Sequence, residues 1–313
     1  MKEPIIQTFG VTKAFKDVIA VNKLDLKVTG GIYGLLGLNG AGKTTTIKMM
    51  IGSLFPTEGH IELFGHDING KEKMNIHNRI GYVPEQPTYF MSMTAEKLLT
   101  YIGSVFQMPV LETKKRINEL LRLVELTDAK NRPIAKFSAG MKQRIGIAQA
   151  LMNDPELLIL DEITSNLDPI GRSQIIELLK DLNKQGKTIF ISTHILPEIQ
   201  KMNADSIAII DHGRLIMEGT VEELNEELKT KEIFISPNHR ILREALSSVV
   251  SNIREEVDSL IINTDKLDEV WKAIAQVALQ NDIIIKEFRS TALDIEQIFM
   301  KALSSEQLEG AEK

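Results

Sequence analysis

A glycine-rich stretch near the N-terminus has the residue types and spacing of a phosphate-binding loop. The sequence GLNGAGKT, Gly37 to Thr44, fits the pattern G-x-x-x-x-G-K-[ST]. Glycines let backbone N–H groups close around phosphate oxygens, and a following helix N-terminus adds a favourable dipole. Lys43 would reach the β and γ phosphates, and Thr44 would hold Mg²⁺. The residues expected to contact a nucleotide here are Gly37, Leu38, Asn39, Gly40, Ala41, Gly42, Lys43, Thr44 and Thr45.

Two adjacent carboxylates follow a second apolar run. LLILDE, residues 157–162, ends in Asp161 and Glu162. One acid at the end of a strand is often an ordinary cap. Two acids downstream of a phosphate-binding loop favour a division of labour, with Asp161 directed toward Mg²⁺ and Glu162 polarising the attacking water.

A histidine ends a third run of this kind. FISTH, residues 190–194, reads as a strand that finishes at His194. A lone histidine is more often structural than catalytic. Because α/β sheets gather ligand groups at the carboxyl ends of their strands, His194 is nevertheless a candidate catalytic residue.

The elements around these residues alternate between strand and helix. Ile32 to Leu36 reads as a strand, and Lys43 to Leu54 as a helix. Further strands are expected at 157–160, 188–192 and 207–210, with a helix at 175–183 between two of them. This alternation predicts an α/β domain with a largely parallel sheet.

Two other parts of the chain have different patterns. Between Thr94 and Asn131 the apolar residues recur at helical spacing, which predicts an inserted helical subdomain, at about residues 90–155. From about Lys231 the order β-α-β-β-α-β, ending in a strand at DIIIKEF, matches a ferredoxin-like α+β arrangement. A last helix is expected at Asp294 to Leu303. The predicted domains are therefore 1–225 and 226–313.

Composition narrows the classes of protein. The 313 residues are 43% hydrophobic and carry a formal net charge of −6, which gives no general attraction to nucleic acid. The absence of cysteine excludes disulfides and thiolate metal sites. No apolar run approaches the roughly 18 residues of a membrane span, and the N-terminus lacks a signal-peptide core. We expect a cytoplasmic protein that reaches a membrane only through a partner and does not insert into it.

A second glycine-containing turn, FSAGMKQR, opens onto a helix at Phe137 to Arg144 and is called the signature segment below. On local grounds Ser138 could be a plain helix N-cap, with Gln143 and Arg144 on a solvated helix face. The motifs taken in order, however, resemble the ATP-binding cassette (ABC) ATPases over roughly Ile5 to Thr220. This resemblance implies a P-loop NTPase cassette with a mainly parallel sheet core, a β-rich N-terminal part and the inserted helical subdomain.

The resemblance also implies roles for residues that spacing leaves undecided. The signature segment is similar to the ABC signature, in which Ser138 and Gly140 would bind the γ phosphate of ATP held by a second cassette, identical or different. Phe137, Ala139 and Met141 depart from the usual LSGGQ. Ser165 to Asp168 resembles the loop that crosses the dimer interface, and His194 the histidine that contacts the γ phosphate.

Two assignments stay open at this point. Phe15 matches the aromatic residue that stacks on adenine, although a buried core position is the alternative. In GYVPEQP the family's glutamine aligns best with Glu85, although Gln86 follows at once. A carboxylate at Glu85 can still face Mg²⁺ through water.

The acidic Glu85, the single cassette and the C-terminal extension are similar to the ATPase subunits of ABC-2 type exporters. The resemblance implies ATP hydrolysis that drives export of a drug, antibiotic, lipid or polysaccharide through a separate membrane permease, with the chain on the cytoplasmic face of the membrane. The alternative is a soluble ABC ATPase that acts on the ribosome or on nucleic acid. A scaffold without turnover is disfavoured, because Lys43, Asp161, Glu162 and His194 are all present.

Overall fold

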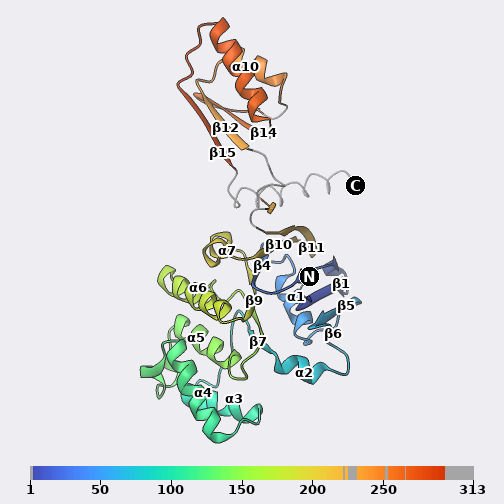
Figure 1. Ribbon diagram of the computed structural model, residues 1–313, viewed down its shortest axis with the longest axis vertical. Coiled ribbons are helices and arrows are strands. Elements are labelled where there is room, and N and C mark those ends of the chain that lie inside the picture. The colour runs from blue at the N-terminus through green and yellow to red at the C-terminus, as the bar shows by residue number, and fades with distance from the viewer. Residues whose placement is uncertain (1–2, 221–222, 225–230, 251–252, 265, 293–313) are drawn as a thin grey trace. The chain divides into compact units, whose positions relative to one another are not determined.

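In the computed structural model the chain divides into two units, Met1–Thr220 and Val221–Lys313 (Figure 1). The structure describes residues 3–220, 223–224, 231–250, 253–264 and 266–292. The division falls after Thr220, a few residues before the predicted boundary at 225. The helix expected at Asp294 to Leu303 lies outside the described residues.

A six-stranded sheet forms the centre of the first unit, in the order β11-β10-β4-β9-β8-β7. Neighbouring strands are parallel from β10 to β7, and β11 pairs with β10 antiparallel. All residues of the three strands β4, β8 and β9 are buried, as expected when helices or another sheet cover both faces. The predicted parallel α/β core is confirmed. Its strands are β4 (Ile32–Leu36), β7 (Ile80–Val83), β8 (Leu157–Asp161), β9 (Thr188–Thr193), β10 (Ser206–Asp211) and β11 (Arg214–Gly219).

An antiparallel sheet from the N-terminal part packs against this centre. It consists of β1 (Ile6–Phe15), β2 (Val18–Leu24), β3 (Lys27–Val28), β5 (Glu58–Leu63) and β6 (His66–Asp67). One hydrophobic cluster joins the two sheets, with Ile6 and Ile61 from the first and Ile159 and Phe190 from the second. Ile47 of helix α1 (Lys43–Met50) belongs to the same cluster. The helix that follows the phosphate-binding loop is thus anchored in the core of the unit.

Helix α1 ends at Met50, earlier than the predicted Leu54. The reason is a glycine turn. Gly52 adopts a left-handed φ of 66°, and the backbone N–H groups of Ser53 and Leu54 both donate to the carbonyl of Lys48, at 3.0 and 3.1 Å. These bonds satisfy the carbonyl groups at the helix end and turn the chain away.

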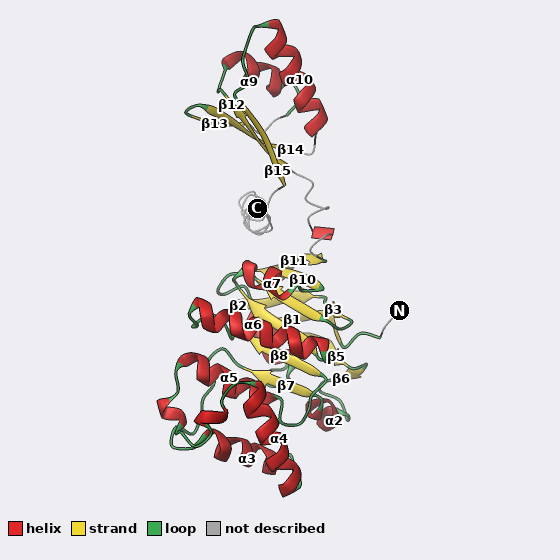
Figure 2. Cartoon of the chain, turned by 60° about the vertical axis from the view of Figure 1, so that its left-hand side comes forward, coloured by secondary structure: helices red, strands yellow, loops and turns green. Residues whose placement is uncertain are grey.

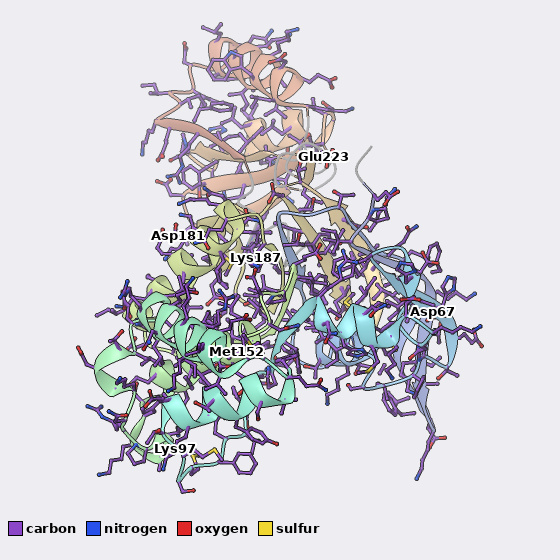
Figure 3. All side chains as sticks on the ribbon, turned by 60° about the horizontal axis from the view of Figure 1, so that its bottom comes forward. Asp67, Lys97, Met152, Asp181, Lys187 and Glu223 are labelled. Carbon is purple, nitrogen blue, oxygen red and sulfur yellow. The ribbon has the colours of Figure 1, made fainter. Side chains whose placement is uncertain are left out.

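The helical subdomain lies beside the edge strand β7, as Figure 2 shows. It contains α3 (Ala95–Val105), α4 (Val110–Leu123) and α5 (Ala139–Ala150), with 3-10 turns at Thr127–Ala129 and Ile134–Lys136. A Cβ added to Gly103 would lie 2.6 Å from the side chain of Thr113, so α3 and α4 approach closely only because residue 103 is glycine. Met152, labelled in Figure 3, is 1% exposed and packs near this contact.

The remaining helices of this unit are α2 (Lys73–Asn78), α6 (Pro169–Lys184) and α7 (Leu196–Met202). The helix predicted at 175–183 is the second half of α6, which begins earlier because Asp168 caps its first turn and Pro169 starts it. Among the helices that the structure describes, none has the length and apolarity that crossing a bilayer requires.

The second unit has the predicted β-α-β-β-α-β order. Its elements are β12 (Lys231–Ser236), α9 (Arg240–Ser247), β13 (Ile253–Glu256), β14 (Ser259–Thr264), α10 (Leu267–Gln280) and β15 (Glu287–Ala292). The antiparallel sheet has the order β13-β14-β12-β15. The last strand begins at Glu287, later than predicted, because Ile283 and Ile285 pack on the core from the loop that follows α10.

Candidate functional site

The phosphate-binding loop connects β4 to α1 and packs tightly against its surroundings. Gly42 has φ 104° and precedes the helix, and a Cβ added there would lie 2.5 Å from the carbonyl oxygen of Ala20. The position therefore needs glycine for both its backbone angle and its contacts. Lys43 is 4% exposed, and its ammonium donates to the carbonyls of Gly37 at 2.6 Å and Leu38 at 3.0 Å.

The carboxylate of Glu162 links this lysine to His194. Its Oε1 lies 3.0 Å from Lys43 Nζ, and its Oε2 lies 3.0 Å from His194 Nδ1. Glu162 adopts a left-handed φ of 46°, and its backbone N–H donates to the carbonyl oxygen of Ser192 at 3.2 Å and to its hydroxyl at 3.1 Å. A left-handed non-glycine residue is a strained conformation that surrounding bonds must hold. Three side chains predicted from separate motifs thus meet at one place.

Asp161 ends β8 and is 1% exposed. Its Oδ1 accepts a hydrogen bond of 2.7 Å from the hydroxyl of Ser192, which is its register partner on β9. Burial and the negative charge of Asp161 together raise the pKa of Tyr82 on β7 to about 12.

Lys43, Glu162 and His194 line a cleft of about 530 Å³. Its lining residues are Ala20, Asn39, Gly40, Gly42, Lys43, Thr44, Thr45, Glu85, Glu162, Ser165, Asn166 and His194. Of the predicted nucleotide contacts, Gly37, Leu38, Ala41 and Phe15 are not among them. Phe15 is 46% exposed, with Lys13 Nζ 5.1 Å from its ring centroid, so the alternative of a buried core position is wrong.

The choice between Glu85 and Gln86 favours Glu85. Glu85 lines the cleft, whereas Gln86 is exposed and does not. The backbone carbonyl of Glu85 also accepts a hydrogen bond of 3.1 Å from Gln143 of α5. The helix of the signature segment is therefore in direct contact with the loop that carries Glu85.

The oxygen donors of the cleft fit a Mg²⁺ ion. Thr44 and Glu85 line it. Asp161 is not among the lining residues, but it is buried next to Glu162 in the chain, and its carboxylate accepts from the neutral hydroxyl of Ser192. Mg²⁺ prefers oxygen ligands and is usually held by one or two carboxylates together with substrate phosphates and waters. In the described part of the chain, no group of three or more His, Asp or Glu side chains forms a separate metal site.

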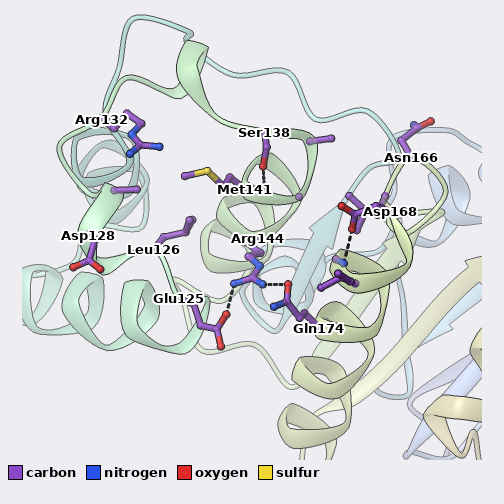
Figure 4. A pocket seen from close by; sticks show the side chains of 16 residues that line it. Glu125, Leu126, Asp128, Arg132, Ser138, Met141, Arg144, Asn166, Asp168 and Gln174 are labelled. Atoms are coloured by element: carbon purple, nitrogen blue, oxygen red, sulfur yellow. Dashed lines mark hydrogen bonds and ion pairs between the residues drawn. The ribbon is translucent and has the colours of Figure 1, made fainter.

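The signature segment faces a different pocket, of about 650 Å³ (Figure 4). Ser138 caps α5, with its hydroxyl accepting from the N–H of Met141 at 3.2 Å, and Gly140 follows in the first turn. Asp168 caps α6 beside the same pocket, accepting from the N–H of Gly171 at 2.6 Å. Ser138 and Gly140 do not line the cleft that contains Lys43.

The alternative interpretation of the signature segment is half right. Ser138 is indeed an N-cap, but Gln143 and Arg144 do not lie on a solvated face. Gln143 is 6% exposed. Arg144 pairs with Glu125 at 2.5 Å and with the side chain of Gln174 on α6 (Figure 4).

Sequence reasoning did not assign roles to Ser192 or Gln143. Ser192 lies two residues before His194 in FISTH, and the alternation of a strand would have placed it on the same face. For Gln143 the sequence holds no signal, because its partner Glu85 comes from a loop far away in the chain.

Comparisons with known proteins agree with this geometry. A family model described as "ABC transporter" matches residues 21–165. The bacitracin transport ATP-binding protein BcrA of Enterococcus faecalis is 35% identical over 308 residues, covering 96% of this chain and 97% of that protein. The daunorubicin/doxorubicin resistance ATP-binding protein DrrA of Streptomyces peucetius is 38% identical, covering 71% of this chain and 67% of its own length.

A solved structure extends the comparison to three dimensions. A dimeric ATP-binding cassette in a post-hydrolysis state, bound to ADP and phosphate, matches with a TM-score of 0.62 at 27% identity. The match covers 69% of this chain and 98% of that cassette. The similarity to the bacitracin protein, in contrast, runs through both units of the chain.

Proposed function

Since this chain belongs to the ATP-binding proteins of ABC transporters, we propose that it drives export of a compound through a separate ABC-2 type membrane permease. The chain is an ATPase that converts ATP and water to ADP and phosphate for transport. Its similarity to transport ATP-binding proteins favours this function over that of an ABC protein acting on the ribosome or on nucleic acid. The observation that carries the export proposal is the near full-length similarity to a bacitracin transport ATP-binding protein. By analogy, the exported compound is an antibiotic, drug, lipid or polysaccharide.

In this proposal ATP enters the cleft and competes with Glu162 for the ammonium of Lys43. The backbone N–H groups from Gly37 to Thr45 surround its phosphates, and Lys43 moves its bond from Glu162 to the β and γ phosphate oxygens. The released Glu162 carboxylate then accepts a proton from the water that attacks the γ phosphorus. His194 contacts Glu162 before ATP binds, and it contacts the γ phosphate once ATP is in the cleft. The exposed Phe15 stacks on adenine.

Thr44, Asp161 and Glu85 would hold Mg²⁺ beside the phosphates. The ion would neutralise charge on the β and γ phosphate oxygens. The burial of Asp161 supports this role, because a carboxylate removed from water is stabilised by a nearby positive charge.

Each site is completed by a second cassette. Ser138 and Gly140 lie in a pocket separate from the chain's own Lys43. The exposed start of α5 supports a contact with ATP held by the partner, since N–H groups and the helix dipole at this point attract phosphate. The loop Ser165 to Asp168 would cross the interface, because its Asn166 lines both pockets.

An exposed apolar patch supports a permease partner. Phe90 and Met91, in the same loop as Glu85, are 59% and 48% exposed, and Tyr101 of α3 is 47% exposed. The rings of Phe90 and Tyr101 meet edge to face at 6.1 Å. Exposed aromatic clusters commonly mark protein interfaces. A permease bound here would contact the loop in which the Glu85 carbonyl accepts a hydrogen bond from Gln143 of the signature helix. It would hold the chain at the cytoplasmic face of the membrane.

The test is recovery of the permease from solubilised membranes of the host with a tagged Glu162→Gln chain and MgATP. We expect a polytopic membrane protein of the ABC-2 type to be recovered, and to be lost when Phe90→Ser is added. Leu111→Ser, at an exposed position on α4, is the matched control and should leave recovery unchanged. Recovery of ribosomal or DNA-bound proteins in place of a permease would contradict the proposal.

A further inference from the structure

A second buried carboxylate lies close to the cleft, on helix α7, and it has no part in the chemistry above. Glu198 is 2% exposed. A carboxylate without water is stable only when hydrogen bonds and a positive charge replace its hydration. The groups that stabilise Glu198 therefore show which segments it holds together.

Its partners come from three different elements. Glu198 Oε2 accepts hydrogen bonds from the hydroxyls of Thr164 at 2.7 Å and of Thr193 at 3.0 Å. Its Oε1 lies 3.1 Å from Nε of Arg172. Thr164 lies in the loop between β8 and α6, Thr193 ends β9, and Arg172 lies near the start of α6.

Two of these partners lie close in sequence to the proposed catalytic pair. Thr193 directly precedes His194, and Thr164 is the second residue after Glu162. The guanidinium of Arg172 also donates to the carbonyl of Leu167 at 3.5 Å, inside the loop Ser165 to Asp168. One buried carboxylate thus contacts the chain next to both catalytic residues and an arginine that contacts the interface loop.

We propose that Glu198 is a positioning residue that makes Glu162, His194 and the loop Ser165 to Asp168 move as one unit. When that loop meets a second cassette, its displacement is transmitted through Glu198 to Thr164 and Thr193. Glu162 and His194 then reach their catalytic positions as the site is completed. Glu198 itself does not line the nucleotide cleft. The inference rests on the proposed roles of Glu162 and His194. The competing account is that Glu198 only fastens α7 to the sheet.

Steady-state kinetics of the full-length chain separate the two accounts. Glu198→Gln keeps the shape and one oxygen acceptor but removes the charge. We expect kcat to fall roughly 10- to 100-fold, the cost of a small misplacement of catalytic groups, while the Kd for ATP stays within about twofold. Gln200→Ala, at an exposed position of the same helix, is the control.

Two further variants keep the test decisive if Glu198→Gln folds poorly. Thr164→Val and Thr193→Val each remove one hydroxyl. Each change breaks part of the same connection through Glu198. The double variant should therefore lose no more turnover than the more impaired of the two single variants. Strictly additive losses, or wild-type kcat with only a lowered Tm, would overturn the positioning role.

Glu162→Gln is measured in the same assay, so that two failures can be told apart. Full turnover in Glu162→Gln would contradict the proposed catalytic pair itself. Full turnover in Glu198→Gln together with lost turnover in Glu162→Gln would overturn the positioning role alone.

Discussion

The molecule has two places where a glycine-containing turn opens onto a helix, and they differ in what surrounds them. The phosphate-binding loop at the start of α1 lies against Glu162 and His194 from two neighbouring strand ends, and its Lys43 is buried. The signature segment at the start of α5 offers an exposed serine hydroxyl and a helix N-terminus. The first place combines a carboxylate, a histidine and a lysine. The second offers a hydroxyl and backbone N–H groups that can donate to an anion.

This difference explains why one chain would carry both. A strand end of a parallel sheet brings groups from several strands together, which suits a site of chemistry. A helix start at the surface of a subdomain is open to a second molecule, which suits a group that must arrive from outside. The proposed full site combines one place of each kind, from two chains.

The largest expected effect on turnover is at Glu162, the proposed general base. Glu162→Gln should lower turnover about 10²- to 10⁴-fold, because the attacking water loses its proton acceptor, while ATP binding persists. The nucleotide-bound dimer should then accumulate and be visible by sedimentation velocity in MgATP. Glu177→Gln, at an exposed position of α6, serves as the control. A monomer at saturating MgATP would count against the account.

Lys43→Ala should weaken ATP binding about 10- to 100-fold, because a charge-assisted bond to phosphate is removed. Isothermal titration calorimetry measures the change directly. Lys48→Ala lies on the same helix and is exposed, so it should bind ATP like the wild type. Unchanged affinity in Lys43→Ala would remove the lysine from the phosphate site.

At the signature segment, capping and phosphate binding can be separated. Ser138→Asp keeps a good N-cap for α5 but places a negative charge toward the partner's γ phosphate. We expect turnover to fall about 10- to 100-fold, with the midpoint of thermal unfolding and ATP binding by the monomer unchanged. Ser138→Thr, which keeps both cap and hydroxyl, should remain active. Equal turnover in Ser138→Asp and Ser138→Thr would show that Ser138 acts only as a helix cap.

The smallest effect is expected at Phe15. Phe15→Ala should weaken ATP binding by about 1 kcal/mol, roughly fivefold, through loss of stacking on adenine. Phe55→Ala removes another exposed ring that also lies beside a lysine, and it should change nothing. A similar shift in both variants would point to a general surface effect.

Much of this arrangement was predictable because short-range patterns determine it. Asp161 ends one apolar strand, His194 directly follows another, and Lys43 starts the helix after the loop that leaves a third. Parallel strands align their carboxyl ends at one edge of the sheet, which brings these groups together. The α/β core and the ferredoxin-like order followed from the same periodicity.

What the sequence missed depends on partners far away in the chain. The burial of Gln143 and the partial burial of Arg144 follow from contacts with Glu85, Glu125 and Gln174. None of these three is a neighbour in sequence. A helical face with a glutamine and an arginine reads as solvated until those elements fold against it. The early end of α1 was missed for a local reason, since the glycine turn at Gly52 outweighs an apolar pattern that continues to Leu54.

The most direct test of the shared site mixes two impaired chains, Lys43→Ala and Ser138→Asp, and measures ATPase activity at an ATP concentration that does not saturate Lys43→Ala. In the mixed dimer one site has both defects and the other has none. We therefore predict that activity returns on mixing, to about a quarter of the wild-type value if pairing is random and the two sites act independently. No recovery, with mixed dimers demonstrated by differential tags, would contradict the claim that the signature segment completes the site of a second chain.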